Sequence, residues 1–241
     1  APHKFTGSGM PPAGAHVPLE HEVILIARKG GKREFRTEEE KRRRHESAIF
    51  WEERNAWYSD VWMELKGARQ RLGEKTARNR SGAYPFELAY RLVGMFSVKG
   101  DTVLDPFLGT GTTLRAAAAA GRNSIGYEIE PGLRSEILSD LPGLVRFANE
   151  RVRVRIDDHL SFVSRCRETG REIKHLNKNY GFPVVTRQET ELLFARLEAV
   201  SPTDADAFQA TYSEDPCRVI DPQRSSSASR HPGADGQLSL F

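Results

Sequence analysis

Two acidic residues with a glycine turn between them could bind a small charged ligand. The stretch DPFLGTGTT covers residues 105–113 and stands between the apolar residues TVL and the alanine-rich stretch LRAAAAAG. Gly109 and Gly111 carry no Cβ, so they permit a tight turn and a close approach of a ligand to the backbone. Glu128 follows at the end of a second short apolar stretch, where an acid is the usual partner of paired ribose hydroxyls. This spacing indicates a nucleotide-type ligand.

The elements that must position these residues form a strand–helix–strand unit. We expect a short buried strand over 102–104 that ends at Asp105, and a helix that Thr112 or Thr113 caps after the glycine turn. The free amides and the dipole at that helix N-terminus favour an anion, either a phosphate or a carboxylate. A second strand over about 124–128 completes the unit.

The glycine pattern matches neither of two common phosphate-binding motifs. The third glycine of Gly-x-Gly-x-x-Gly is missing, which argues against a dinucleotide, and Gly-x-x-x-x-Gly-Lys-Ser/Thr does not occur. What remains is an adenosine-like ligand that carries a carboxylate rather than a pyrophosphate. S-adenosylmethionine fits this description.

The stretches VLDPFLGTGTT and IGYEIEP resemble the cofactor-binding motifs of DNA amino-methyltransferases, and GAYPFELAYRLVGMFS resembles the segment that precedes those motifs. The last stretch also has the apolar spacing of an amphipathic helix. The order of the segments is similar to the later part of the circularly permuted β-type arrangement, over roughly residues 5–135. The resemblance implies a three-layer, Rossmann-like α/β methyltransferase fold that binds S-adenosyl-L-methionine. It places these residues at the cofactor: Tyr84, Pro85, Phe86, Asp105, Pro106, Phe107, Gly109, Thr110, Gly111, Thr112 and Glu128.

The family's catalytic tetrad, Asp/Ser/Asn-Pro-Pro-Tyr/Phe, does not occur in the sequence. In the family the tetrad binds the target amine and stacks on the flipped-out base. The catalytic residues are therefore unknown, and we expect either a fragment of a larger enzyme or a split enzyme whose partner chain carries the tetrad. The resemblance implies methyl transfer to cytosine N4 or adenine N6 in DNA. The alternatives are a catalytically silent DNA-binding or accessory subunit and methylation of a non-DNA substrate.

A basic, aromatic-rich region precedes the cofactor motifs. The net charge is only +3, but residues 28–80 hold an excess of Lys and Arg together with all three tryptophans. Thr37 and Glu40 have the spacing of a capping box, which predicts a helix from about residue 38. Basic side chains among aromatic ones suit phosphate contacts and base stacking, although such charge runs are often only solvated and tryptophans often pack a core. We expect contacts to double-stranded DNA from Arg42, Arg43, Arg44, Trp57 and Tyr58.

The rest of the chain is predicted to be helical and then disordered. The segment that leads to Asp157 could be a strand or part of a long helix, and apolar residues at helical spacing between 145 and 160 favour the helix. Thr186 and Glu189 have the spacing of a second capping box before an apolar stripe, which predicts a packing helix. The predicted parts are 1–30, the end of the catalytic half; 31–80, the DNA-contact region; 81–135, the cofactor-binding part; 136–200, a helical extension; and 201–241, a disordered tail.

The last five residues, QLSLF, resemble the motif with which bacterial replication and repair proteins dock on the sliding clamp. At the end of a polar tether, such a peptide would be free to enter a groove of the partner. The resemblance implies clamp contacts from Gln237, Leu238, Leu240 and Phe241.

Composition sets further limits. A chain of 241 residues that is 38% hydrophobic has enough apolar residues for one sizeable core, and it shows no membrane-span pattern or signal peptide, so we expect a cytoplasmic protein. The two cysteines lie far apart and suggest neither a disulfide nor a zinc site. His159 and His175 are expected at the surface. The DDH run at 157–159 lacks the spacing of a metal site, so no metal is expected.

Overall fold

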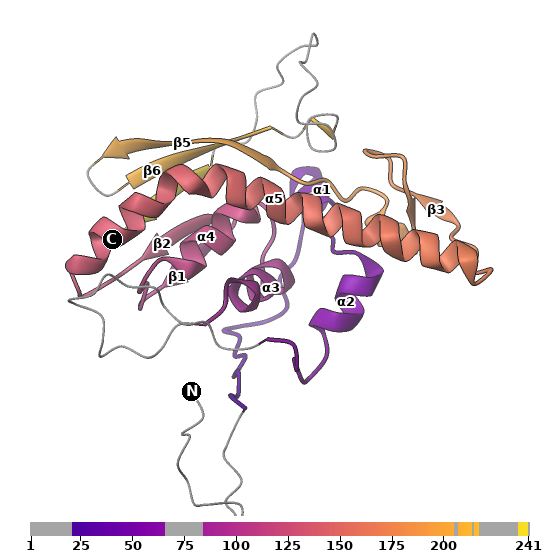
Figure 1. The fold of residues 1–241 in the computed structure, drawn as a ribbon, viewed down its shortest axis with the longest axis horizontal. Coiled ribbons are helices and arrows are strands. Elements are labelled where there is room, and N and C mark those ends of the chain that lie inside the picture. Colours follow the sequence, from indigo (N-terminus) through magenta and orange to yellow (C-terminus); the bar gives the residue numbers. More distant parts are fainter. Residues whose placement is uncertain (1–20, 66–83, 205–206, 214, 217–235, 241) are drawn as a thin grey trace, which may run out of the picture. The chain divides into compact units, whose positions relative to one another are not determined.

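A mixed five-stranded sheet runs through the chain, with the strand order β1-β2-β7-β6-β5 (Figure 1). The computed structural model describes residues 21–65, 84–204, 207–213, 215–216 and 236–240. Helices pack against the strands, which confirms the expected α/β class. The parallel strands are β1 (Thr102–Asp105), β2 (Asn123–Gly126) and β7 (Gly236–Leu240), and β6 (Ala207–Ser213) is antiparallel to both β7 and β5 (Arg196–Asp204).

The strands β1 and β2 and the helix α4 (Thr112–Ala119) form the predicted strand–helix–strand unit. Thr102 pairs with Asn123 and Asp105 pairs with Gly126, so both strands end at the same edge of the sheet. Four successive alanines of α4, residues 116–119, are buried. Their small side chains let the helix lie close to its neighbours, and the turns that follow β1 and β2 come together.

The 37-residue helix α5 (Gly132–Glu168) confirms the helix predicted from the apolar spacing. Leu144 and Ala148 pack in a first core cluster with residues of α3 (Phe86–Phe96), α4, β5 and β6. One and two turns further on, Val152 and Ile156 pack in a second cluster around Phe50, which lies between α1 (Glu38–Glu46) and α2 (Trp51–Trp57). One helix therefore serves both cores.

The packing helix predicted after Thr186 is wrong. The capping box is present, because Glu189 accepts hydrogen bonds from Thr186, but it begins only the three-residue 3₁₀ helix η1 (Arg187–Glu189). Leu192 and Phe194 then pack into the second cluster two residues apart, and the chain continues as β5. The side-chain amide of Asn177 donates to the carbonyls of Glu189 and Leu192, which fixes this non-helical path.

The helical extension predicted over 136–200 is thus helical only as far as the end of α5. After α5, the strands β3 (His175–Leu176) and β4 (Pro183–Val184) form a short antiparallel hairpin. The hairpin and η1 both lie in the segment between α5 and β5.

The disordered tail predicted over 201–241 is also wrong in part. Residues 201–204 and 207–213 belong to β5 and β6, where Phe208, Ala210 and Tyr212 alternate as buried residues. The backbone of 236–240 forms β7, which pairs with β2 on one side and β6 on the other. Residues 217–235 and Phe241 lie outside the described residues.

The described residues of the peptide predicted to bind a sliding clamp, 237–240, are therefore part of the sheet rather than a free tail. Leu238, for example, pairs with Ser124 of β2 and with Phe208 of β6. Clamp binding by Gln237, Leu238, Leu240 and Phe241 stays a prediction, and it would require β7 to leave the sheet.

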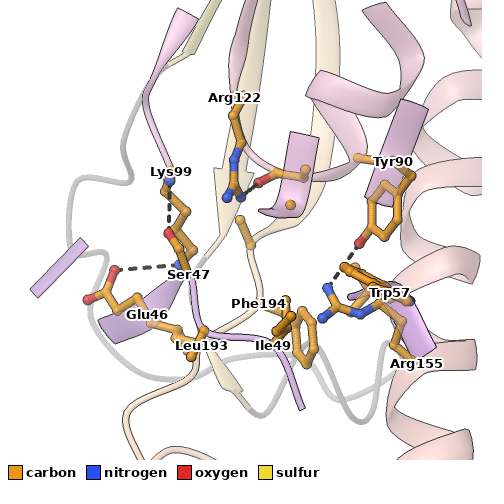
Figure 2. A pocket seen from close by; sticks show the side chains of 16 residues that line it. Glu46, Ser47, Ile49, Trp57, Tyr90, Lys99, Arg122, Arg155, Leu193 and Phe194 are labelled. Atoms are coloured by element: carbon orange, nitrogen blue, oxygen red, sulfur yellow. Dashed lines mark hydrogen bonds and ion pairs between the residues drawn. The ribbon is translucent and has the colours of Figure 1, made fainter. Parts of the chain in front are cut away.

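A small hollow lies where the two core clusters meet, beside the amino ends of β1 and β2 (Figure 2). Arg122 points into it and donates to the carbonyls of Ser97 and Ala120, which end α3 and α4. Burial lowers the pKa of this guanidinium to about 10. Because Arg122 satisfies the last carbonyls of two helices, we interpret the hollow as structural.

Two residues expected at the surface are buried instead. Trp57 is 3% exposed and meets Tyr90 edge-on, so the expected DNA contact through Trp57 is wrong. His159 is fully buried, stacks on Phe50 at 3.9 Å and donates from Nε2 to the carbonyl of Pro183. In both cases an aromatic ring fills a core between elements that are distant in the sequence.

Candidate functional site

The glycine turn after β1 lies beside the loop that follows β2. Gly109 and Gly111 have positive φ values of 56° and 79°, in the left-handed region that favours glycine. The amide of Leu108 donates to the carbonyl of Tyr127 (2.8 Å), which joins the two loops. The turn predicted from the sequence is confirmed, and its backbone is held in place by the neighbouring strand's loop.

The N-terminus of α4 faces this turn. The N-cap residue is Gly111, not Thr112 or Thr113, and no side chain of the described residues caps the helix. The first-turn amides of an uncapped helix can donate to an anion, and the helix dipole favours negative charge there. A carboxylate-bearing ligand fits this end of the site.

Glu128 connects the two loops through its carboxylate. One oxygen accepts from the amide of Gly109 (2.8 Å) and the other accepts from the amide of Glu130 (2.9 Å). A carboxylate oxygen can accept more than one hydrogen bond, so Glu128 can still accept from hydroxyl groups of a ligand. The acid predicted to bind a ribose also holds the glycine turn.

Asp105, Tyr84 and Thr113 form a hydrogen-bonded group on the other side of the turn. One oxygen of Asp105 accepts from the amide of Phe107, and the other accepts from the Tyr84 hydroxyl at 3.2 Å. The Tyr84 hydroxyl also lies 2.5 Å from Oγ1 of Thr113. Burial raises the pKa of Tyr84 and the nearby charge of Asp105 adds to this, whereas the bond with Thr113 acts in the opposite direction.

The three residues before and at the start of α3 differ in how they contribute to the candidate cofactor site. Tyr84 reaches Asp105, but Pro85 is the N-cap of α3 and makes no side-chain capping bond. Phe86 stacks on Tyr90 and meets Phe147 edge-on, so its ring belongs to the core. Of these predicted cofactor residues, only Tyr84 presents a polar group to the site.

Large apolar side chains surround the carboxyl ends of β1 and β2. Phe107 is 85% exposed and Ile129 is 89% exposed, although both are large hydrophobic residues. Exposed apolar surface next to polar groups is typical of a ligand site. Ile129 was not predicted, and the only signal for it is its position directly after Glu128.

The basic helix α1 is exposed, but much of its positive charge is paired. Arg42 bonds to Glu46 and Arg43 bonds to Glu39, whereas Arg44 lies over the ring of Phe35. Tyr58 is also exposed, and the guanidinium of Arg54 lies 5.6 Å from its ring. The side chains available for a nucleic acid are therefore fewer than the sequence indicated.

Within the described ranges, no group of three or more His, Cys, Asp or Glu side chains could hold a metal ion. The same part of the chain contains no helix of the length and hydropathy that crossing a membrane requires.

An acid and a glycine turn at the carboxyl ends of neighbouring parallel strands define a nucleotide-type ligand site in an α/β fold. The family model for DNA methylases of the N6 and N4 type matches residues 3–138, and the chain belongs to this family.

Two curated relatives are type II methyltransferases. M.MthZI from Methanothermobacter thermautotrophicus is 51% identical over 213 residues, which cover 88% of this chain and 59% of that protein. M.MjaI from Methanocaldococcus jannaschii is 42% identical over 164 residues, which cover 68% of this chain and 50% of that protein. The chain thus spans little more than half the length of these relatives.

A solved structure from Thermus thermophilus is also similar. It is assigned as a DNA modification methylase, is complexed with S-adenosyl-L-methionine and is 35% identical. The match covers 58% of this chain and 50% of that one, with a TM-score of 0.45.

Proposed function

We propose that this chain is the cofactor-binding part of a DNA methyltransferase that transfers a methyl group from S-adenosyl-L-methionine to adenine N6 or cytosine N4. The observation that carries the proposal is the arrangement around the ends of β1 and β2. Glu128 and Asp105 flank a glycine turn beside the uncapped N-terminus of α4. Membership of the DNA methylase family supports the same assignment.

Each part of the site fits one part of this cofactor. The first-turn amides of α4 would bind its carboxylate, Asp105 its ammonium group and Glu128 its ribose hydroxyls. Phe107 and Ile129 would cover its apolar surface, since both side chains are exposed beside the site. When bound, the cofactor supplies an electrophilic methyl group. The residues of this chain orient that group and need not supply a nucleophile.

The edge of β1 supports the proposal that a further part completes the enzyme. Among the described residues, β1 pairs with β2 alone and forms one edge of the sheet. Leu104 in this edge strand is 61% exposed. An open edge with an apolar side chain can pair with another strand. We propose that the part carrying the tetrad Asp/Ser/Asn-Pro-Pro-Tyr/Phe joins here, whether in the same polypeptide or in a partner chain.

A second candidate function is a catalytically silent DNA-binding or accessory subunit, because the tetrad is absent from these 241 residues. The two candidates differ in what completes them. Methyl transfer to DNA after addition of a polypeptide that carries the tetrad supports the first, and DNA binding without transfer under the same conditions supports the second.

Cofactor binding tests the central proposal. The chain should bind S-adenosylhomocysteine in isothermal titration calorimetry, and Asp105→Asn should weaken that binding about tenfold or more, because it removes a charge beside the ammonium group. The asparagine side chain keeps an oxygen for the Phe107 amide, so the turn should stay folded, which circular dichroism can check. Equal affinities of the variant and the wild type would contradict the role of Asp105.

DNA binding tests the predicted contact region. Arg44 has no carboxylate partner among the described residues, so Arg44→Ala should weaken binding to all sequences alike and lower the salt-dependence slope by about 1. Arg42→Ala should have a smaller effect, because Glu46 already pairs with Arg42. The matched control is Arg153→Ala on α5, whose arginine pairs with Glu150 and Asp157. If the slope is the same in all three variants, α1 does not contact phosphates.

A further inference from the structure

Thr113 is the last residue of the stretch 105–113, for which the sequence suggested at most a helix-capping role, but its side chain contacts the cofactor site. It lies in the first turn of α4, and its hydroxyl is within 2.5 Å of the Tyr84 hydroxyl rather than at a capping position. Tyr84 in turn donates to Asp105, which lies at the end of β1. Three elements that are separate in the sequence thus meet through three side chains.

The direction of these hydrogen bonds follows from their chemistry. An ionised carboxylate only accepts, so the Tyr84 proton is committed to Asp105. The Tyr84 oxygen must then accept at Thr113, and Thr113 is the donor of that bond. The chain of donation runs from Thr113 through Tyr84 to Asp105. It leaves acceptor positions on Tyr84 Oη and on Asp105, and it leaves no free donor between them.

We propose that Thr113 is a positioning residue that sets the recognition of the cofactor's amino-acid end. By donating to Tyr84, it holds the phenol oxygen as an acceptor beside the Asp105 carboxylate. An ammonium group carries three donors and a positive charge, which this pair of acceptors matches. Without the Thr113 hydroxyl, the Tyr84 side chain would keep its bond to Asp105 but lose the second bond that fixes the position of its oxygen. The inference rests on the proposed function and specifies which residues recognise the amino-acid end of the cofactor.

Two ligands separate this role from general damage to the pocket. S-adenosylhomocysteine has the amino-acid end, whereas 5′-methylthioadenosine has the same nucleoside without it. In titration calorimetry, Thr113→Val should weaken S-adenosylhomocysteine binding about tenfold, the effect expected for one oriented hydrogen bond. The same variant should leave the affinity for 5′-methylthioadenosine unchanged. Thr113→Ser, which restores the hydroxyl, should recover most of the lost affinity.

A double-mutant cycle gives an independent check. Tyr84→Phe should weaken S-adenosylhomocysteine binding by a similar factor, and the double variant should weaken it little further, because both changes break one hydrogen-bonded chain. Thr169→Val is the matched control, since within the described part of the chain the Thr169 hydroxyl bonds only to backbone carbonyls at the end of α5. This control should bind both ligands like the wild type.

The outcomes that overturn the inference are distinct from failure of the proposed function. Unchanged binding of S-adenosylhomocysteine by Thr113→Val would remove any positioning role, and equal weakening of both ligands would show a merely structural one. If the folded wild-type chain binds neither ligand, the proposed cofactor site itself is wrong and the inference fails with it.

Discussion

Replacing Glu128 by Ala is expected to lower the affinity for S-adenosylhomocysteine by about 100-fold or more. The carboxylate accepts from the amides of Gly109 and Glu130, so its loss would release the glycine turn and the loop after β2 at the same time. It would also remove the proposed acceptor for the ribose hydroxyls. Hydrogen bonds to charged groups contribute about 1.5–3 kcal/mol each. The loss of one contact to the ligand, together with the loss of an ordered turn, therefore explains a decrease in affinity of about 100-fold.

Two variants sharpen this measurement. Glu128→Gln keeps one acceptor oxygen but loses the charge, so its affinity should lie between those of the wild type and Glu128→Ala. Asp140→Ala removes a carboxylate that pairs with Arg115 on the surface, and it should leave the affinity unchanged. If Glu128→Ala stays folded and binds like the wild type, the ribose assignment is wrong.

Replacing Gly126 by Ala is expected to destabilise the folded chain by about 1–3 kcal/mol, the range for overpacked cores. A Cβ at residue 126 would lie 2.7 Å from both methyl carbons of Leu108, closer than packed atoms approach. Leu108 is 3% exposed, so it cannot turn out into solvent without losing its place in the core. Urea unfolding followed by tryptophan fluorescence measures the loss.

The control for this variant is Gly143→Ala in α5. A Cβ at residue 143 meets nothing within 4 Å, and alanine is favoured over glycine inside a helix by about 1 kcal/mol. Gly143→Ala should therefore be neutral or stabilising. In the Gly126→Ala background, Leu108→Ala should lower the free energy of unfolding by less than it does in the wild type, because it removes the atoms that clash. Strict additivity of the two changes would contradict the proposed contact.

The local part of the site could be predicted from the sequence, because its parts are close together along the chain. The strand, glycine turn and alanine-rich helix follow one another within 102–119, and Glu128 follows the next strand. Their geometry depends on backbone rules that act over a few residues. For the same reason the long helix α5 was predicted from its apolar spacing.

The features that the sequence did not reveal depend on contacts between distant segments. Local propensity after Thr186 favours a helix, but Asn177 and the second core cluster hold the chain in another path. The burial of Trp57 is decided by α3, which lies some thirty residues later in the chain. The contact of Tyr84 with Thr113 joins the segment before α3 to the first turn of α4. No periodicity in a single segment encodes such contacts.

The length of helix α5 determines how the described part of the chain unfolds. Its 37 residues extend over about 55 Å, and it supplies side chains first to one core cluster and then to the other. Neither cluster can melt completely while the helix stays intact, because each would leave a continuous apolar stripe of α5 in water. The backbone amides around the second cluster and those beside the cofactor site should therefore have similar free energies of opening in hydrogen exchange. The two regions should then unfold as one cooperative unit rather than as separate lobes.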